Sequence, residues 1–214
     1  LISVFLLEGI YFYNFTTPEF NVNICQIPFW SLTVYYSWQS FKNDKTHNWI
    51  LLGLFAGLGF LSKYLFIYLL ISIKIFFIYY LKKNKKFNFK YLIPIIVFFL
   101  VLSPHLLWLA GNDYKTIAYG LKRTSLENST FLNHLIYPIK FIFKQAVTLV
   151  PFFMLLAIIL KKFQYKFDKR DEKSIFLILI TLVPILLMFT TSLIFGANIR
   201  TMWMTPFYLF FGLF

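Results

Sequence analysis

Polar residues at the ends of apolar segments are the part of this sequence that could do chemistry. Lys63 and Tyr64 place a cation and a phenol between two apolar segments, where the ammonium group could bind a phosphate. The same two residues could instead anchor the chain at a membrane surface, with the lysine extended towards water. Glu19 follows Pro18, which predicts a helix with the acid in its first turn, where the helix dipole favours an anion.

More candidates lie in the longest polar loop, residues 111–133, and in a short polar stretch near residue 200. Tyr119 with Lys122 or Arg123 has the i, i+3 or i, i+4 spacing that places side chains on one helix face. A short helix of this kind at a membrane interface could bind a lipid phosphate, or could simply rest on headgroups. The candidate binding residues are Glu19, Lys63, Tyr64, Asp113, Lys122, Arg123, Arg200 and Trp203.

The composition predicts that these residues are held by a membrane protein. Hydrophobic residues make up 59% of the chain and charged residues 14%, against roughly 45–50% and 25% in soluble domains. The net charge of +13 would suit nucleic acid in a soluble protein. Here the positive charge lies in short runs between apolar segments, so membrane orientation explains it better and no nucleic-acid partner is expected.

The apolar segments predict an all-α fold, a polytopic transmembrane helix bundle of about eight helices. Residues 91–110, for example, would form about 30 Å of helix, which matches the hydrocarbon core of a bilayer. We expect residues 1–214 to form a single transmembrane domain that is an internal fragment of a longer protein. The predicted spans are 1–13, 24–41, 49–61, 64–81, 91–110, 135–160, 175–196 and 204 onward, the first and last incomplete.

Lysine and arginine predict how the bundle is oriented. Most of these 21 residues lie in alternate loops, around residues 42–45, 82–90 and 161–173. The positive-inside rule makes those loops cytoplasmic and predicts a multi-pass protein of the inner (plasma) membrane. The loops at 15–23, 63, 111–133 and 197–203, which carry the candidate residues, are then on the outer face.

Motifs of soluble enzymes do not occur. The sequence has no Walker loop, no G-x-G-x-x-G after a strand, no H-E-x-x-H and no G-x-S-x-G. Its one cysteine, Cys25, cannot close an internal disulfide, and no metal-ligand spacing surrounds it. His105, near the outer end of a predicted span, is more often a packing residue than a ligand in such a position.

Four short motifs occur in an order and spacing that resemble a known family. Together they resemble the polyprenyl-phosphate-dependent glycosyltransferases of the GT-C fold, family 39, which includes protein O-mannosyltransferases and the aminoarabinose transferases of lipid A. The resemblance covers essentially the whole chain. The motifs are Thr17-Pro18-Glu19, Gly57-Leu58-Gly59-Phe60-Leu61-Ser62-Lys63-Tyr64, Pro104-His105-Leu106-Leu107-Trp108 with Asn112, and Met202-Trp203-Met204-Thr205-Pro206.

The resemblance implies transfer of a sugar from a polyprenyl-phosphate donor to a lipid, glycan or protein acceptor on the outer face, in the synthesis of cell-envelope glycan or lipopolysaccharide. It implies that cations stabilise the departing phosphate. It also implies that Glu19 and Asp113 bind the acceptor, coordinate a metal or pair with a cation. No cofactor is certain, although a divalent metal is compatible with the family. The family has Asp where Glu19 stands and His where Met202 stands, and its catalytic acid lies in a first outer loop expected upstream of Leu1.

Two other classes of protein fit the pattern of spans. A transporter or lipid flippase needs polar groups near the middle of the bilayer, and Lys74, Lys140 and Lys144 are the charged residues well inside spans. No acid inside the spans is evident to pair with them, which counts against transport. A non-catalytic scaffold would not need the outer acid and cations to converge. Convergence of Glu19, Lys63, Arg123 and Arg200 therefore distinguishes the glycosyltransferase from both alternatives.

Overall fold

The computed structural model describes residues 1–14, 19–84, 88–124, 130–160 and 171–213, which form helices and turns with no strand. The α-helices are α1 (Ile2–Leu7), α2 (Tyr11–Asn14), α3 (Val22–Asn43), α4 (Thr46–Ser62), α5 (Ile67–Asn84), α6 (Ile93–Ala110), α7 (Lys115–Arg123), α8 (Asn133–Leu160) and α9 (Glu172–Phe195). The 3-10 helices are η1 (Tyr64–Phe66), η2 (Phe89–Leu92), η4 (Thr201–Tyr208) and η5 (Phe211–Leu213). The predicted all-α helix bundle is confirmed.

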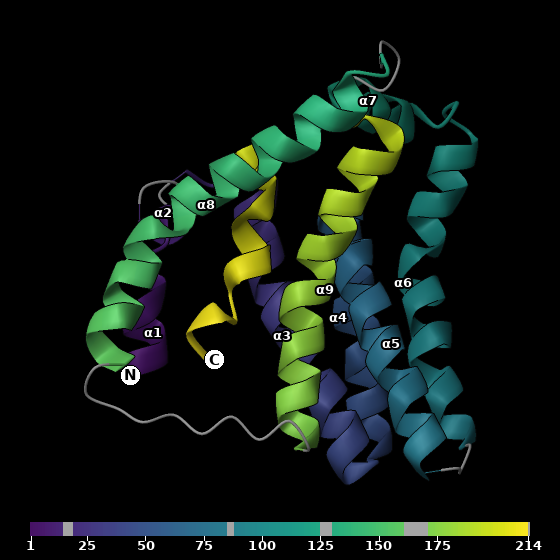
Figure 1. Cartoon of the computed structure of the whole chain (residues 1–214). Coiled ribbons are helices and arrows are strands. Elements are labelled where there is room, and N and C mark those ends of the chain that lie inside the picture. The colour runs from purple at the N-terminus through teal and green to yellow at the C-terminus, as the bar shows by residue number, and fades with distance from the viewer. Residues whose placement is uncertain (15–18, 85–87, 125–129, 161–170, 214) are drawn as a thin grey trace.

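Helices α3, α4, α5, α6 and α9 form the body of the bundle and run side by side (Figure 1). Helix α4 packs against α3 on one side and α6 on the other, and α5 packs against α9. Glycine allows the close approach of α4 to α6, because a Cβ atom at Gly53 would lie 2.6 Å from the carbonyl oxygen of Pro94. The sequence of α4 therefore places Gly53 where the backbone of α6 comes near.

Helix α8 leaves this body. It meets α9 near its beginning and then runs diagonally towards α1 (Figure 1). Gly9, between α1 and α2, lies against the backbone of Phe152 in α8, where a Cβ atom would come within 2.7 Å of the Phe152 Cα. The first and last described segments also meet, since η5 packs against α1.

Four of the described helical segments are long and apolar enough to cross a membrane: 64–83, 89–110, 133–159 and 172–195. Helix α4 is apolar but shorter. Helix α3 has the length of a span but is not among the four, because polar side chains interrupt it. Gln26, Thr33 and Ser37 are fully buried within the bundle, so α3 presents its polar side chains to other helices. The chain is a membrane protein, and four of its described apolar helices have the length that a bilayer requires.

Three predictions of local structure are wrong. Residues 1–13 form the short helices α1 and α2, separated by a turn at Glu8–Ile10, and not the end of one continuous span. The segment from 204 onward belongs to 3-10 helices, and Pro206, which has no N–H to donate, lies within η4. Glu19 lies outside α3, which begins at Val22, because the side chain of Asn21 caps that helix through the N–H groups of Asn23 and Ile24.

The connections between helices fall at two ends of the bundle (Figure 1). We call one the Lys63 end: it holds the beginning of α3, the α4–η1 turn, the end of α6, α7 and the end of α9. The other is the Lys42 end, with the end of α3, the end of α5 and the beginning of α9. The described lysines of the predicted cytoplasmic loops, Lys42, Lys45, Lys82, Lys83, Lys90 and Lys173, are at the Lys42 end. The candidate binding residues are at the Lys63 end.

Candidate functional site

Lys63 is the central residue of the Lys63 end. Helix α4 ends at Ser62, and Lys63 takes an extended conformation, with φ −167° and ψ 132°, before η1 begins. This turn directs the side chain across to α3, where its Nζ donates a 2.5 Å hydrogen bond to the Oδ1 of Asn23. The ammonium nitrogen also lies 4.9 Å from the centre of the Trp203 ring, a cation–π distance. Three segments that are distant in sequence therefore meet at one cation.

The environment of Lys63 disfavours the protonated, charged form of its side-chain amine. Burial, followed by the positive charge of Arg123, lowers the pKa of Lys63 from its usual 10.5 to about 7. Within the described part of the chain, the two ion pairs, Lys83–Glu172 and Lys90–Asp44, are both at the Lys42 end. No described carboxylate compensates Lys63, so an anion that enters this site would meet a cation without a partner acid.

Arg123 supplies the second cation of the site. It is the last residue of α7, the short helix predicted from the spacing of Tyr119, Lys122 and Arg123. Its Nη1 donates a 2.9 Å hydrogen bond to the hydroxyl oxygen of Tyr119, and its guanidinium carbon lies 5.4 Å from the centre of the same ring. The N–H of Asn198 donates to the carbonyl oxygen of Thr124, 2.9 Å away, and ties the end of α7 to the segment before η4.

Tyr64 has a different environment from that of its neighbour Lys63. Its hydroxyl oxygen lies 2.7 Å from the Nε2 of His105 in α6 and 2.6 Å from the Oγ1 of Thr116 in α7. The imidazole of His105 stacks on the indole of Trp108, with an interplanar angle of 17° and 6.0 Å between ring centres. Thus the start of η1, the last turns of α6 and the first turn of α7 are joined at one hydroxyl group.

The remaining predicted residues lie around this centre with less contact. Trp203 is buried beneath Lys63, and its backbone N–H donates to the carbonyl oxygen of Arg200, 3.0 Å away. Arg200 is exposed at the start of η4, and Lys122 is exposed on α7. Asp113 is exposed and has φ 52°, in the left-handed region that a turn before α7 requires.

Glu19 is exposed, and its described hydrogen bond uses its backbone oxygen, which accepts from the side chain of Asn21. The structure therefore places the Lys63 ammonium group over the Trp203 ring and within electrostatic reach of Arg123. Arg200 lies three residues before Trp203 in the chain. The structure does not bring the carboxylate of Glu19 into hydrogen-bonding or ion-pair contact with these cations among the described residues. The first residues of its motif, Thr17 and Pro18, lie outside the described residues.

Sequence reasoning missed two residues that shape the site. Asn23 is 4% exposed and accepts the hydrogen bond from Lys63, while Gln26 is fully buried and donates through its Nε2 to the carbonyl oxygen of Lys63, 3.1 Å away. The two amides are three residues apart and share a helix face. This pair of amides at the start of an apolar segment is the signal that could have identified them.

Within the described residues, no three His, Cys, Asp or Glu side chains come together in a group that could hold a metal ion. The residues described thus supply cations, amides and hydroxyl groups at the Lys63 end.

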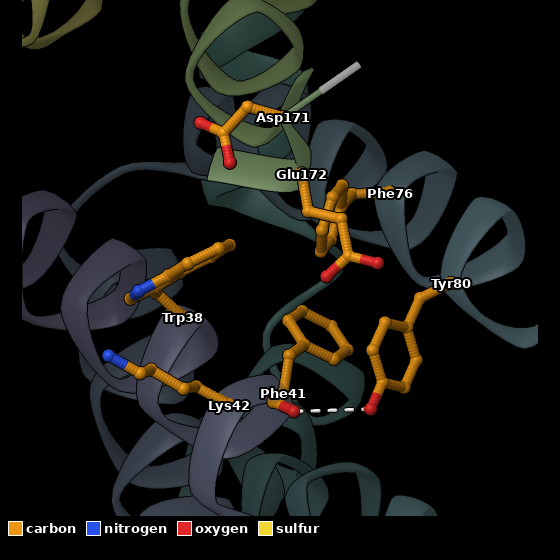
Figure 2. A pocket seen from close by; sticks show the side chains of 7 residues that line it. All are labelled: Trp38, Phe41, Lys42, Phe76, Tyr80, Asp171 and Glu172. Carbon is orange, nitrogen blue, oxygen red and sulfur yellow. Dashed lines mark hydrogen bonds between the residues drawn. The ribbon is translucent and has the colours of Figure 1, made fainter. Parts of the chain in front are cut away.

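A cavity of about 540 Å³ lies at the opposite, Lys42 end (Figure 2). Lys42 and Trp38 lie on one side of it and Glu172 and Tyr80 on the other. Both acids that line it are engaged: Asp171 caps α9 through the N–H of Ser174, and Glu172 pairs with Lys83 at 2.6 Å. Its charged lining, with two acids and one lysine, does not favour an anion.

Comparison with known proteins identifies a family for the first half of the chain. Residues 1–108 match the family described as dolichyl-phosphate-mannose-protein mannosyltransferase. This half of the chain includes Lys63, Tyr64 and His105, whereas α7 and η4 follow it. The chain matches no curated protein and no solved structure. With a matched region of this extent and a bundle of apolar helices, the chain belongs to the dolichyl-phosphate-mannose-protein mannosyltransferase family, whose members are membrane glycosyltransferases of the GT-C type.

Proposed function

We propose that this protein transfers a sugar from a polyprenyl-phosphate-sugar donor to a lipid, glycan or protein acceptor at the non-cytoplasmic face of the inner membrane. The observation that carries the proposal is the position of Lys63 at the Lys63 end, partly buried, near Arg123 and without a described carboxylate partner. The phosphate of the donor is the anion that such a site would bind. The lysine-rich Lys42 end would then face the cytoplasm.

The chemistry of the transfer explains why cations are needed at this position. The acceptor hydroxyl oxygen forms a bond to the anomeric carbon of the sugar, and the bond from that carbon to the phosphate oxygen breaks. The phosphate leaves with the electron pair, so the lipid changes from a singly charged diester to a monoester that carries about −1.5 to −2 at pH 7. The proton of the acceptor goes to a general base.

Lys63 and Arg123 act on the charge that develops in this step. Because the negative charge of the phosphate grows as the sugar departs, two nearby cations stabilise the transition state more than the bound donor. Partial burial strengthens their effect, since less water screens the interaction. Glu19, Asp113, Lys122 and Arg200 border the same end and are available to orient the acceptor. A transporter has less support, because Lys74, Lys140 and Lys144 are exposed on their helices.

The test is transfer of labelled sugar by the full-length protein in liposomes that contain a polyprenyl-phosphate sugar. We expect Lys63→Ala and Arg123→Ala each to reduce kcat/KM by about 100-fold, the size seen when one group that stabilises a developing oxyanion is removed. Lys82→Ala, an exposed lysine at the Lys42 end, is the matched control and should retain wild-type turnover. Unchanged turnover in both site variants would remove these residues from the site.

The orientation has a separate test. Single cysteines at Ala118 in α7 and at Lys82 at the end of α5, in a Cys25→Ser background, should react differently with a membrane-impermeant maleimide added to intact cells. Ala118→Cys should be labelled from outside and Lys82→Cys only after the membrane is permeabilised. The reverse pattern would place the Lys63 end in the cytoplasm and would contradict transfer on the non-cytoplasmic face.

A further inference from the structure

We propose that Tyr64 is a positioning residue, whose hydroxyl group, held by His105, fixes α7 through Thr116 so that Arg123 faces the phosphate bound at Lys63. The inference rests on the proposed function for its effect on catalysis. It assigns Tyr64 a role different from contact with the phosphate. It also gives a role to His105, which the sequence alone marked as a packing residue.

Helix α7 needs such an attachment because burial does little to hold it. None of its residues is buried, and the apolar side chains of Ile117 and Leu121 are 40% and 47% exposed. In the described part of the chain, two hydrogen bonds connect α7 and its C-terminal cap to the rest of the bundle. One joins Tyr64 to Thr116 near its beginning, and the other joins Asn198 to Thr124 after its end.

The helical geometry of α7 connects Thr116 to Arg123. The two residues are seven positions apart, which is nearly two full turns at 3.6 residues per turn. They therefore lie on almost the same face, about 10 Å apart along the axis. A hydrogen bond that directs Thr116 towards Tyr64 also rotates Arg123 towards the bundle. Arg123 is indeed close enough to Lys63 for its charge to act on that ammonium group.

His105 fixes the other side of the Tyr64 hydroxyl. A phenol has one proton to donate and can also accept, so it can bond to both neighbours at once. With the His105 Nε2 at 2.7 Å and the Thr116 Oγ1 at 2.6 Å, both positions are filled. The imidazole is itself held against Trp108. Tyr64 and Lys63 are adjacent in the chain, so the residue that positions α7 and the residue that binds the phosphate share one turn.

The first experiment is a double-mutant cycle on sugar transfer by the full-length protein. Tyr64→Phe removes only the hydroxyl group and should reduce kcat/KM about tenfold. Thr116→Val should reduce kcat/KM by the same amount, whereas Thr116→Ser keeps the hydroxyl group and should retain wild-type transfer. In an Arg123→Ala background, Tyr64→Phe should change kcat/KM less than twofold, because the group that it positions is absent. Tyr114→Phe, which removes an exposed hydroxyl beside α7, is the control and should have no effect. Additive effects of Tyr64→Phe and Arg123→Ala would overturn the proposal.

The second experiment measures the position of α7 directly and does not depend on activity. Spin labels at Leu61→Cys in α4 and Ala118→Cys in α7, in a Cys25→Ser background, report the distance between the two helices. Tyr64→Phe should broaden or shift the distance distribution, and Tyr114→Phe should not. An unchanged distribution in Tyr64→Phe would overturn the positioning role. If wild-type protein transferred no sugar, the proposed function would fail, while the distances would still decide whether Tyr64 holds α7.

Discussion

The ammonium nitrogen of Lys63 donates a 2.5 Å hydrogen bond to the side-chain oxygen of Asn23, a residue 40 positions earlier in the chain. The amide accepts this bond without neutralising the lysine, since a neutral oxygen carries no compensating charge. The cation is therefore oriented but still able to attract an anion. This arrangement differs from that of Lys90 at the other end, which pairs with the carboxylate of Asp44.

The pH dependence of transfer should reflect the ionisation of Lys63. Its pKa of about 7 means that it is charged below that pH and increasingly neutral above it. A neutral amine cannot stabilise the phosphate, so kcat/KM should fall as the pH rises through about 7. Lys63→Arg remains charged at every accessible pH and should lose this limb of the profile. An identical limb in wild type and Lys63→Arg would assign the ionisation to another group.

Two substitutions of Asn23 should move that limb in opposite directions. Asn23→Asp places a carboxylate beside Lys63, which raises the pKa of Lys63 and shifts the limb towards alkaline pH. The same carboxylate competes with the donor phosphate, so the KM for donor should rise about tenfold. Asn23→Ala removes the acceptor of the protonated amine and should shift the limb towards acid. Initial rates over a range of pH and donor concentration measure the two shifts and the change in KM. A shift of the limb in the same direction in both variants would contradict the hydrogen bond between Lys63 and Asn23.

The close packing of α4 on α6 should make Gly53 sensitive to substitution. A Cβ atom there would lie 2.6 Å from the backbone oxygen of Pro94, which cannot turn away as a side chain could. Gly53→Ala should therefore lower the free energy of unfolding in detergent by about 1–3 kcal/mol. Gly120→Ala in α7 is the control, because nothing lies within 4 Å of its added methyl group. Alanine has a higher helix propensity than glycine, so Gly120→Ala should leave the free energy of unfolding unchanged or raise it.

Asp44 should stabilise the Lys42 end through its hydrogen bonds. Its carboxylate accepts from the Trp49 Nε1 at 2.9 Å, the Asn88 Nδ2 at 3.0 Å and the Lys90 Nζ at 3.2 Å. Asp44→Ala should lower the free energy of unfolding by about 1–2 kcal/mol, since these groups lose their acceptor.

Asp44→Asn separates the effect of the negative charge from that of hydrogen bonding and of the backbone at Asp44. Asparagine tolerates the left-handed φ of 46° and keeps one acceptor oxygen, so it should cost less than alanine. Thermal unfolding in detergent compares the two variants. Equal losses in both would attribute the effect to the charge of Asp44 and not to hydrogen bonding.

The sequence by itself determined the helical class and most helix positions, because apolar segments bounded by polar loops are a local pattern. The predicted span at 175–196 corresponds to α9, Glu172–Phe195, and the turn at Lys63 and the helix before Thr124 were also predicted. The same pattern failed where a neighbour decides the conformation. Gly9 lies against Phe152 at the break between α1 and α2, a contact that no local pattern reveals.

Only the tertiary structure decided which of the candidate residues lie close together at the Lys63 end. Residue type and spacing identified Lys63, Arg123 and Trp203 as candidates, but not their proximity to one another. The contacts of Lys63 with Asn23 and of Tyr64 with His105 and Thr116 join residues that are 40 to 52 positions apart. Side-chain pairing over such separations depends on how the helices pack, and the same packing removes the water that would otherwise keep the pKa of Lys63 at its ordinary value.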